Sequence, residues 1–135
     1  MKYLFTLIII PILFFNTKTQ QQNVAGKWIG EDQNEIGYIF FNTDGYAAFE
    51  IEGKTMGGEE FVMNGQKGKM TYTINYKTTP IEVDFTMTKL DSGESKNILG
   101  IIEFLDKDTM NFDMSFDSKR PTEFGERSII LRRVK

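Results

Sequence analysis

The chain has 135 residues, which is enough for one domain with a single core and too few for two. Its 13% aromatic content, twelve glycines and three prolines favour antiparallel β-structure and exclude a disordered chain. The formal net charge of −3, without a basic run, excludes a nucleic-acid-binding surface, and the chain has neither cysteine nor histidine.

The first nineteen residues have the pattern of a secretory signal peptide. Lys2 precedes an apolar run over residues 3–15, and polar residues follow it. This run is too short to cross a bilayer, which takes about 20 residues. We therefore expect a signal peptide over residues 1–19, a polar leader over 20–23 and one domain over 24–135. This predicts export to the periplasm or the extracellular space, with no membrane span in the mature chain; the alternative is an uncleaved segment that tethers the protein to the membrane.

The first half of the domain contains strand-length runs separated by turn residues. Asn42-Thr43-Asp44-Gly45 has glycine at the fourth position of a turn, where type I turns favour it. Asn64-Gly65 is the strongest short hairpin signal in the chain. The segment Gly53–Gly58 is interpreted as a loop. The predicted strands of this half cover residues 24–31, 35–42, 46–52 and 59–63.

The second half alternates between apolar and polar residues with a period of two. This pattern is typical of half-buried antiparallel strands, and no stretch shows the period of a helix. The predicted strands cover residues 70–77, 81–88, 97–105, 110–117 and 129–134. A series of short strands linked by hairpin turns predicts an all-β fold: a small antiparallel up-and-down barrel of about eight strands, in which closure removes the sheet edges.

The only tryptophan, Trp28, lies between Gly26 and Gly30 in the first predicted strand. Glycines at such spacing indicate that another backbone or side chain comes close. The last predicted strand carries Arg132 and Arg133, and a guanidinium that stacks on an indole is stabilised by about 0.5–2 kcal/mol. We therefore predict that the last strand returns to the first and that an arginine covers Trp28. The alternative is that Trp28 is an ordinary core residue and both arginines are solvated.

Gly26-Lys27-Trp28 resembles the Gly-x-Trp sequence in the first strand of lipocalins and related calycin barrels. In those proteins an arginine of the last strand covers the tryptophan, which implies this role first for Arg132 and second for Arg133.

The region from residue 24 to residue 134 also resembles an uncharacterised family of exported bacterial lipocalin-like domains that is common in planctomycetes. One departure is Ile102, which stands where that family has an aromatic residue. Because the family has no established activity, the resemblance supports the architecture more than the function. The matching segments are Thr79–Phe85, Ile98–Phe104, Asp108–Met110 and Arg120–Phe124.

Small barrels are just wide enough to be filled by side chains or to hold one small ligand. Arg120 has two interpretations: it binds a ligand carboxylate bidentately, or it pins its own loop to Asp84 or Asp117. Tyr72 and Tyr76 would supply the polar groups of a pocket. The predicted ligand-binding residues are Tyr72, Tyr76, Phe85, Met87, Phe112, Met114 and Arg120.

The absence of cysteine and histidine excludes thiolate and imidazole nucleophiles and the usual zinc and haem ligands. The segment from Asp32 begins like a calcium-binding loop, but Ile36 and Thr43 occupy two of its ligand positions. We therefore expect a non-catalytic protein without metal or cofactor. The first functional hypothesis is a barrel that binds a small apolar or amphipathic molecule. The second is a solid-cored envelope or extracellular module that meets an unidentified protein partner.

Overall fold

The computed structural model describes residues 22–32 and 35–135, and there the chain is an all-β, antiparallel fold. Its ten strands form one sheet in the order β4-β3-β2-β1-β10-β9-β8-β7-β6-β5. The predicted signal peptide, residues 1–19, lies outside the described residues. Within them, no helix is long and apolar enough to span a membrane. The strands are β1 (Gly26–Asp32), β2 (Glu35–Phe41), β3 (Ala47–Ile51), β4 (Lys54–Gly57), β5 (Phe61–Met63), β6 (Gln66–Asn75), β7 (Ile81–Lys89), β8 (Ser95–Asp106), β9 (Thr109–Ser115) and β10 (Ile129–Arg133).

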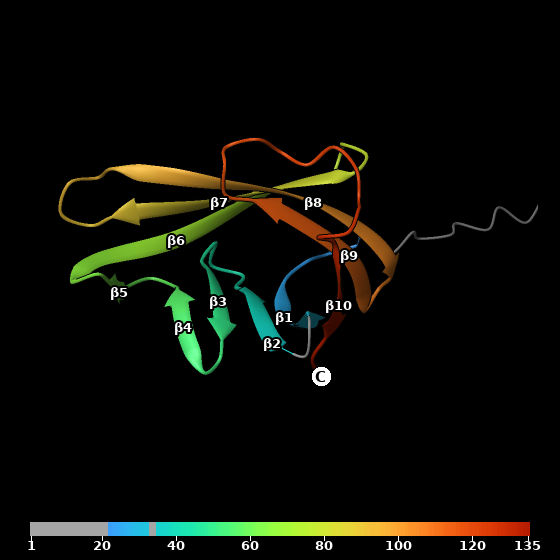
Figure 1. Cartoon of the computed structure of the whole chain (residues 1–135), viewed down its shortest axis with the longest axis horizontal. Coiled ribbons are helices and arrows are strands. Elements are labelled where there is room, and N and C mark those ends of the chain that lie inside the picture. The colour runs from blue at the N-terminus through green and yellow to red at the C-terminus, as the bar shows by residue number, and fades with distance from the viewer. Residues whose placement is uncertain (1–21, 33–34) are drawn as a thin grey trace, which may run out of the picture.

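The last strand, β10, lies between β1 and β9, so the two ends of the domain meet in the middle of the sheet (Figure 1). In this pairing Trp28 is opposite Arg133 and Gly30 is opposite Leu131. All other neighbouring strands are consecutive in the sequence, as in a meander. The prediction that the last strand returns to the first is confirmed.

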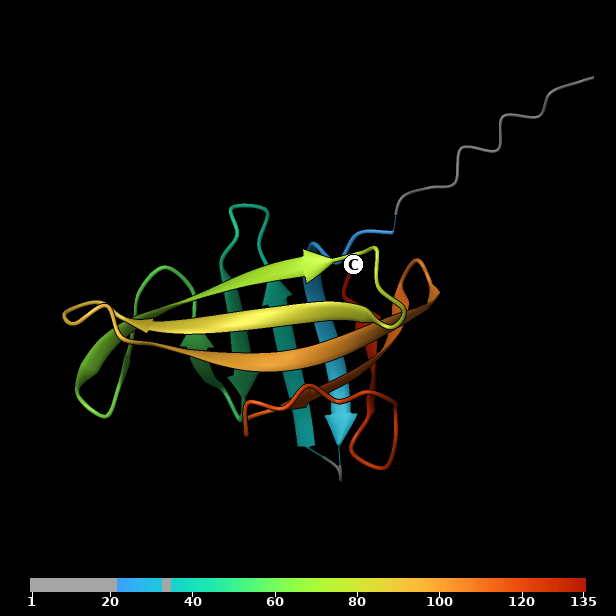
Figure 2. The same cartoon turned by 90° about the horizontal axis from the view of Figure 1, so that it is seen from above.

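The barrel is closed by single backbone hydrogen bonds from β6 to the segments that flank β3 and β4, instead of a regular ladder. The Met70 N–H donates to the Gly58 carbonyl over 3.0 Å, and the Tyr72 N–H donates to the Gly45 carbonyl over 3.1 Å. These bonds bring β6 against the β3–β4 region. Figure 2 shows the result: the long strands β6, β7 and β8 cross β1, β2 and β3. The sheet is thus a nearly closed barrel.

The strand count differs from the expected eight, and one predicted loop is a strand. Lys54–Gly57, within the segment interpreted as a loop, is β4 and pairs with β3. The reason is a two-residue turn at Glu52 and Gly53, which have φ values of 53° and 77°. Asn64-Gly65, recognised from the sequence, has nearly the same geometry, with φ values of 53° and 75°. Glu-Gly is a weaker signal because a left-handed glutamate is strained.

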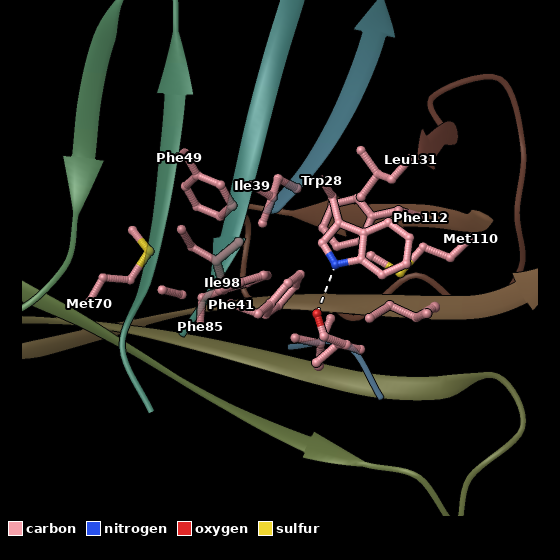
Figure 3. Close-up of a cluster of buried hydrophobic side chains, with 14 residues drawn as sticks. Trp28, Ile39, Phe41, Phe49, Met70, Phe85, Ile98, Met110, Phe112 and Leu131 are labelled. Atoms are coloured by element: carbon pink, nitrogen blue, oxygen red, sulfur yellow. Dashed lines mark hydrogen bonds between the residues drawn. The ribbon is translucent and has the colours of Figure 1, made fainter. Parts of the chain in front are cut away.

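The core forms from alternate residues of each strand, as the period of two predicts. On β7, Val83 and Phe85 are fully buried, whereas Asp84 between them is half-buried and bonds to the β9–β10 connection. Phe85 packs against neighbouring aromatic rings from three other strands (Figure 3). The largest fully buried side chains are Trp28, Phe41, Phe85, Phe112, Met70, Ile98, Ile101, Ile102, Met110, Leu131, Val24 and Val83.

Candidate functional site

One end of the barrel is filled by Trp28 and its neighbours. The indole is completely buried, and its Nε1–H donates to the Val24 carbonyl over 2.8 Å, the bond drawn in Figure 3. The ring of Phe104 meets the indole edge-on, with 6.3 Å between ring centroids. The Arg133 guanidinium lies 4.4 Å from the indole centroid. An arginine of the last strand therefore covers Trp28, as predicted.

The assignment of that role to Arg132 was wrong, and strand register explains why. Residues opposite each other in an antiparallel pair point to the same face. Trp28 pairs with Arg133, whereas Arg132 pairs with Ile29 and is exposed. The Arg133 guanidinium also donates to Asp108 over 3.0 Å and to the Ala25 carbonyl over 2.6 Å. Because its donors are used inside the protein, the Arg133 guanidinium is not free to bind a ligand.

We call the junction of β1 and β10 around Trp28 and Arg133 the seam. The glycines that flank Trp28 make room there, as their spacing indicated. A Cβ at Gly30 would lie 2.7 Å from Leu131 Cδ2, and a Cβ at Gly26 would lie 3.0 Å from Arg133 Nη1. Real Cβ atoms essentially never come within 2.7 Å of another heavy atom, so only glycine at position 30 allows β10 to approach β1 this closely. The two predicted glycines are therefore part of the closed seam.

The other end of the barrel is hollow and contains two apolar cavities. Cavity 1 has a volume of about 610 Å³ and lies between β4, β5 and the adjoining ends of β6, β7 and β8. Cavity 2 has a volume of about 290 Å³ and lies among β1, β2, β3, β9 and β10. The apolar side chains that line cavity 1 are Met56, Phe61, Met63, Met87, Ile98 and Phe116, and those of cavity 2 include Ile39, Phe49, Met56, Phe112, Met114 and Phe116.

Met56 and Phe116 line both cavities and therefore stand between them. Phe116 is 54% exposed, which leaves its ring at the opening. Methionine is unbranched and has three rotatable bonds, so it adapts to irregular apolar surfaces. Phe116 follows the last paired residue of β9, Ser115. We call this end, defined by the two cavities, the mouth.

A glycine pair contributes to the volume of cavity 2. Gly30 and Gly37 are opposite each other on β1 and β2, and both line this cavity. A Cβ built at Gly37 has no neighbour closer than the Glu50 carbonyl oxygen at 3.7 Å. Larger side chains would therefore fit at Gly37, and the glycine leaves empty a space that the core could have used.

Three of the predicted ligand-binding residues line the mouth. Met87 lines cavity 1, and Phe112 and Met114 line cavity 2. Phe85 does not, because it is packed between other core aromatics. The role of the lining residues in ligand binding stays a prediction.

Tyr72 and Tyr76 line neither cavity, so they do not supply polar groups there. The Tyr72 hydroxyl donates to the Asn42 carbonyl over 2.9 Å, and the Tyr76 hydroxyl accepts from the Val24 N–H over 3.2 Å. Burial raises the pKa of Tyr72, and the neighbouring Tyr76 and Asp44 raise it further. Tyr72 therefore remains a protonated donor that ties β6 to the turn after β2.

Arg120 also lies away from both cavities, and its contacts match the structural alternative. Its Nη2 donates to Asp84 over 2.6 Å, and its Nη1 donates to the carbonyls of Gly100 and Val83 over 2.9 and 3.2 Å. The next residue on β8, Ile101, is only 2% exposed although it lies outside the core cluster. Arg120 therefore holds the β9–β10 connection against the outer face of β7 and β8.

The chemistry of the mouth is that of binding by apolar contact. Among the described residues, no group of three or more acidic side chains is arranged to hold a metal ion. Comparisons with protein-family models, curated protein sequences and solved structures found no significant match. The candidate site therefore depends on its geometry alone.

Met56, Phe61 and Gly37 were missed as site residues by sequence reasoning. Met56 lay in the supposed loop, and Phe61 in a short strand without clear alternation. Gly37 gave no signal beyond its place in an apolar strand. The pairing of β4 with β3 places Met56 opposite Phe49 and thus on the inner face, and the weak turn signal of Glu52-Gly53 was its only trace in the sequence.

Proposed function

We propose that the protein is an exported, non-catalytic, lipocalin-like binding protein that holds a small apolar or amphipathic molecule at the mouth of its barrel. The supporting observation is the pair of apolar cavities that share Met56 and Phe116. Small-molecule sites typically have about 300–1,000 Å³ and are lined mainly by apolar side chains with a few polar groups. Cavity 1, at about 610 Å³, lies in the middle of this range.

The non-catalytic part of the proposal comes from the residue types in the chain. Without cysteine or histidine, acid–base or nucleophilic chemistry would fall to carboxylates, lysines or tyrosines. Tyr72 and Tyr76 use their hydroxyls in hydrogen bonds with the backbone. A hydrolase screen on the purified protein is expected to find no activity.

Binding is tested with N-phenyl-1-naphthylamine, a neutral dye whose fluorescence rises in apolar surroundings. Phe116→Asp places a charge beside both cavities and removes apolar contact, so we expect the dye to bind at least about tenfold more weakly. Leu105→Asp is the matched control, because Leu105 is 53% exposed and lines neither cavity. Equal dye affinity of the two variants, each shown to be folded by circular dichroism, would contradict binding at the mouth.

A cavity-filling pair separates the two hollows. Gly37→Leu directs a side chain toward cavity 2, whereas Gly125→Leu adds the same atoms to the β9–β10 connection, where a Cβ meets nothing within 4 Å. We expect Gly37→Leu to weaken dye binding if the ligand extends into cavity 2 and to leave it unchanged if cavity 1 alone is used. Gly125→Leu is expected to bind like the unchanged protein.

Export and the natural ligand are tested together by native mass spectrometry of the protein purified from its own host. Loss of the first nineteen residues, which leaves Gln20 at the N-terminus, is the expected outcome for a cleaved signal peptide. A small mass that travels with the protein and is released on denaturation would identify the ligand. An intact N-terminus in the membrane fraction would favour the tethered alternative.

The second candidate function is a solid-cored interaction module. The observation that favours it is the filled part of the barrel, where Trp28, Phe41 and Phe85 are at most 1% exposed. A module of this kind would bind neither the dye nor a co-purifying small molecule, so the two experiments above also discriminate between the two functions.

A further inference from the structure

We infer that the ligand of cavity 1 is a single-chain amphipath with an anionic head group, which lies against Lys96 while the apolar chain enters the cavity. The inference rests on the proposed function, because it concerns the same mouth. It begins from an irregularity in two strands, where lysines take positions that the alternation reserves for apolar residues.

On β7, Val83 and Phe85 are buried, Met87 lines cavity 1, and the next residue with the same orientation is Lys89. A side chain two residues further along a strand points to the same face. Lys89 therefore lies on the same, inner face of the sheet as Phe85 and Met87, beyond the buried core.

The neighbouring strand β8 repeats this arrangement. Ile98 is fully buried, and Lys96, two residues before it, is opposite Met87. Directly opposite residues of an antiparallel pair share a face, so Lys96 lies on the same face as Met87. Both lysines line cavity 1.

Ion pairing distinguishes these lysines. Lys89 Nζ lies 3.0 Å from Glu94 Oε2, and Lys67, a third lysine of the lining, lies 3.1 Å from Glu60 Oε1. Lys96 takes part in none of the ion pairs found within residues 22–32 and 35–135. Among the described residues that line cavity 1, Lys96 is thus the cation that remains available to a ligand.

The combination of an apolar hollow and an unmatched cation at its edge fits one class of molecule. A hydrocarbon chain gains about 25 cal/mol for each Å² of apolar surface removed from water. A carboxylate, sulfate or phosphate at its end can remain partly hydrated at the rim and still pair with Lys96. Because this pair is exposed, it adds selectivity more than affinity, about two- to fivefold.

The first experiment compares head groups on one chain length. Dodecanoate, dodecyl phosphate and dodecyltrimethylammonium each compete with bound N-phenyl-1-naphthylamine at low and at high salt. We expect both anions to displace the dye at concentrations about two- to fivefold lower than the cation, with the difference reduced at high salt. Equal displacement by anion and cation would overturn the inference and leave the proposed function intact. Failure of the dye itself to bind would overturn the proposed function.

The second experiment locates the head group. Lys96→Gln should remove the preference for anions, measured within this variant as the ratio of the anion and cation concentrations that displace the dye. Lys77→Gln is the matched control, because Lys77 is also exposed, carries the same charge and lines neither cavity. An anion preference that survives in Lys96→Gln would overturn the role of this lysine.

The same variants identify the source of the anion. Flotation with vesicles of phosphatidylglycerol in phosphatidylcholine, compared with phosphatidylcholine alone, measures binding to lipid in a bilayer. Anion-dependent flotation that is lost in Lys96→Gln would assign the head group to a membrane lipid. Displacement by dispersed dodecanoate without flotation would assign it to a free amphipath.

Discussion

The two ends of this barrel share strands β1, β8 and β10 but differ in how their space is used. At the Trp28 end, a completely buried indole, the ring of Phe104 and the guanidinium of Arg133 fill the interior. At the mouth, Met56 and Phe116 stand between two cavities of about 610 and 290 Å³. Rigid rings with fixed hydrogen bonds occupy one end, and flexible thioethers with glycine occupy the other.

Polar groups show the same contrast. The Arg133 guanidinium makes four hydrogen bonds, three of them to carbonyl oxygens of the backbone. At the mouth, Lys67 and Lys89 form ion pairs with exposed partners. Exposed pairs contribute little to stability, whereas hydrogen bonds from a charged donor to partly buried carbonyls contribute more. We therefore expect substitutions at the seam to lower the free energy of unfolding strongly and substitutions at the mouth to lower it little.

Truncation of one aromatic residue at each end gives the largest expected difference. Trp28→Ala leaves a cavity and removes the hydrogen bond to the Val24 carbonyl, so the free energy of unfolding should fall by about 3–5 kcal/mol. Phe116→Ala should lower it by less than about 1 kcal/mol, because that ring is already 54% exposed. Urea unfolding followed by circular dichroism measures both changes. Similar losses at the two ends would contradict the assignment of stability to the seam.

The two adjacent arginines of β10 allow a closer test of the seam. Arg133→Met removes the contact with the indole and the bonds to the Ala25 and Asn23 carbonyls, so the unfolding free energy should fall by about 2–3 kcal/mol. Arg132→Met removes an equal charge from the opposite face and should change it by less than about 0.5 kcal/mol. The same urea titration applies. A larger effect from Arg132 would restore the role that the family resemblance implied for it.

Much of the fold could be predicted from the sequence, because alternation is a local property. The period of two on β7 correctly placed Val83 and Phe85 inside and Asp84 outside. The return of the last strand to the first could also be predicted, since a tryptophan and an arginine at the two ends of a domain suggest contact. The β3–β4 hairpin could not, because a left-handed conformation of Glu52 depends on the strands that it joins.

Less of the site could be predicted, because a cavity depends on register between distant strands. Met87, Phe112 and Met114 were selected for their inward orientation, and they line the mouth. Tyr76 has the same parity on its strand as Tyr72, yet it is 38% exposed because it lies beyond the end of β6. An inward residue fills the core or leaves a space depending on the residues that lie opposite it on other strands. The sequence of a single strand does not show which residues these are.

The β9–β10 connection borders the mouth, because it begins beside Phe116, and Arg120 holds it against β7 and β8. Arg120→Met removes the bonds to Asp84 and to the Gly100 carbonyl, and we expect the unfolding free energy to fall by about 1–2 kcal/mol. Limited proteolysis should then cleave the connection faster. Arg127→Met is the control, since Arg127 lies on the same connection and is exposed. Equal proteolysis of the two variants would show that Arg120 does not hold the connection in place.

The smallest expected effect is the response of the seam to acid. Partial desolvation raises the pKa of Asp108, but the positive charges and hydrogen bonds of Lys135 and Arg133 lower it more, so its pKa lies below the ordinary value of 3.8. A carboxyl group whose pKa is depressed by folding stabilises the fold above its unfolded pKa, and this contribution disappears as the pH falls through the folded pKa.

Asp108→Asn should therefore be less stable than the unchanged protein at neutral pH and should approach its stability as the pH falls below 3.8. Urea unfolding of both proteins across this range measures the difference. Asp106→Asn is the control, because Asp106 lies in the same turn, is exposed and forms none of the ion pairs found among the described residues. A stability difference for Asp108→Asn that stays constant with pH would mean that its carboxylate charge contributes nothing to the seam. Arg133 would then be held there by the indole and the backbone carbonyls alone.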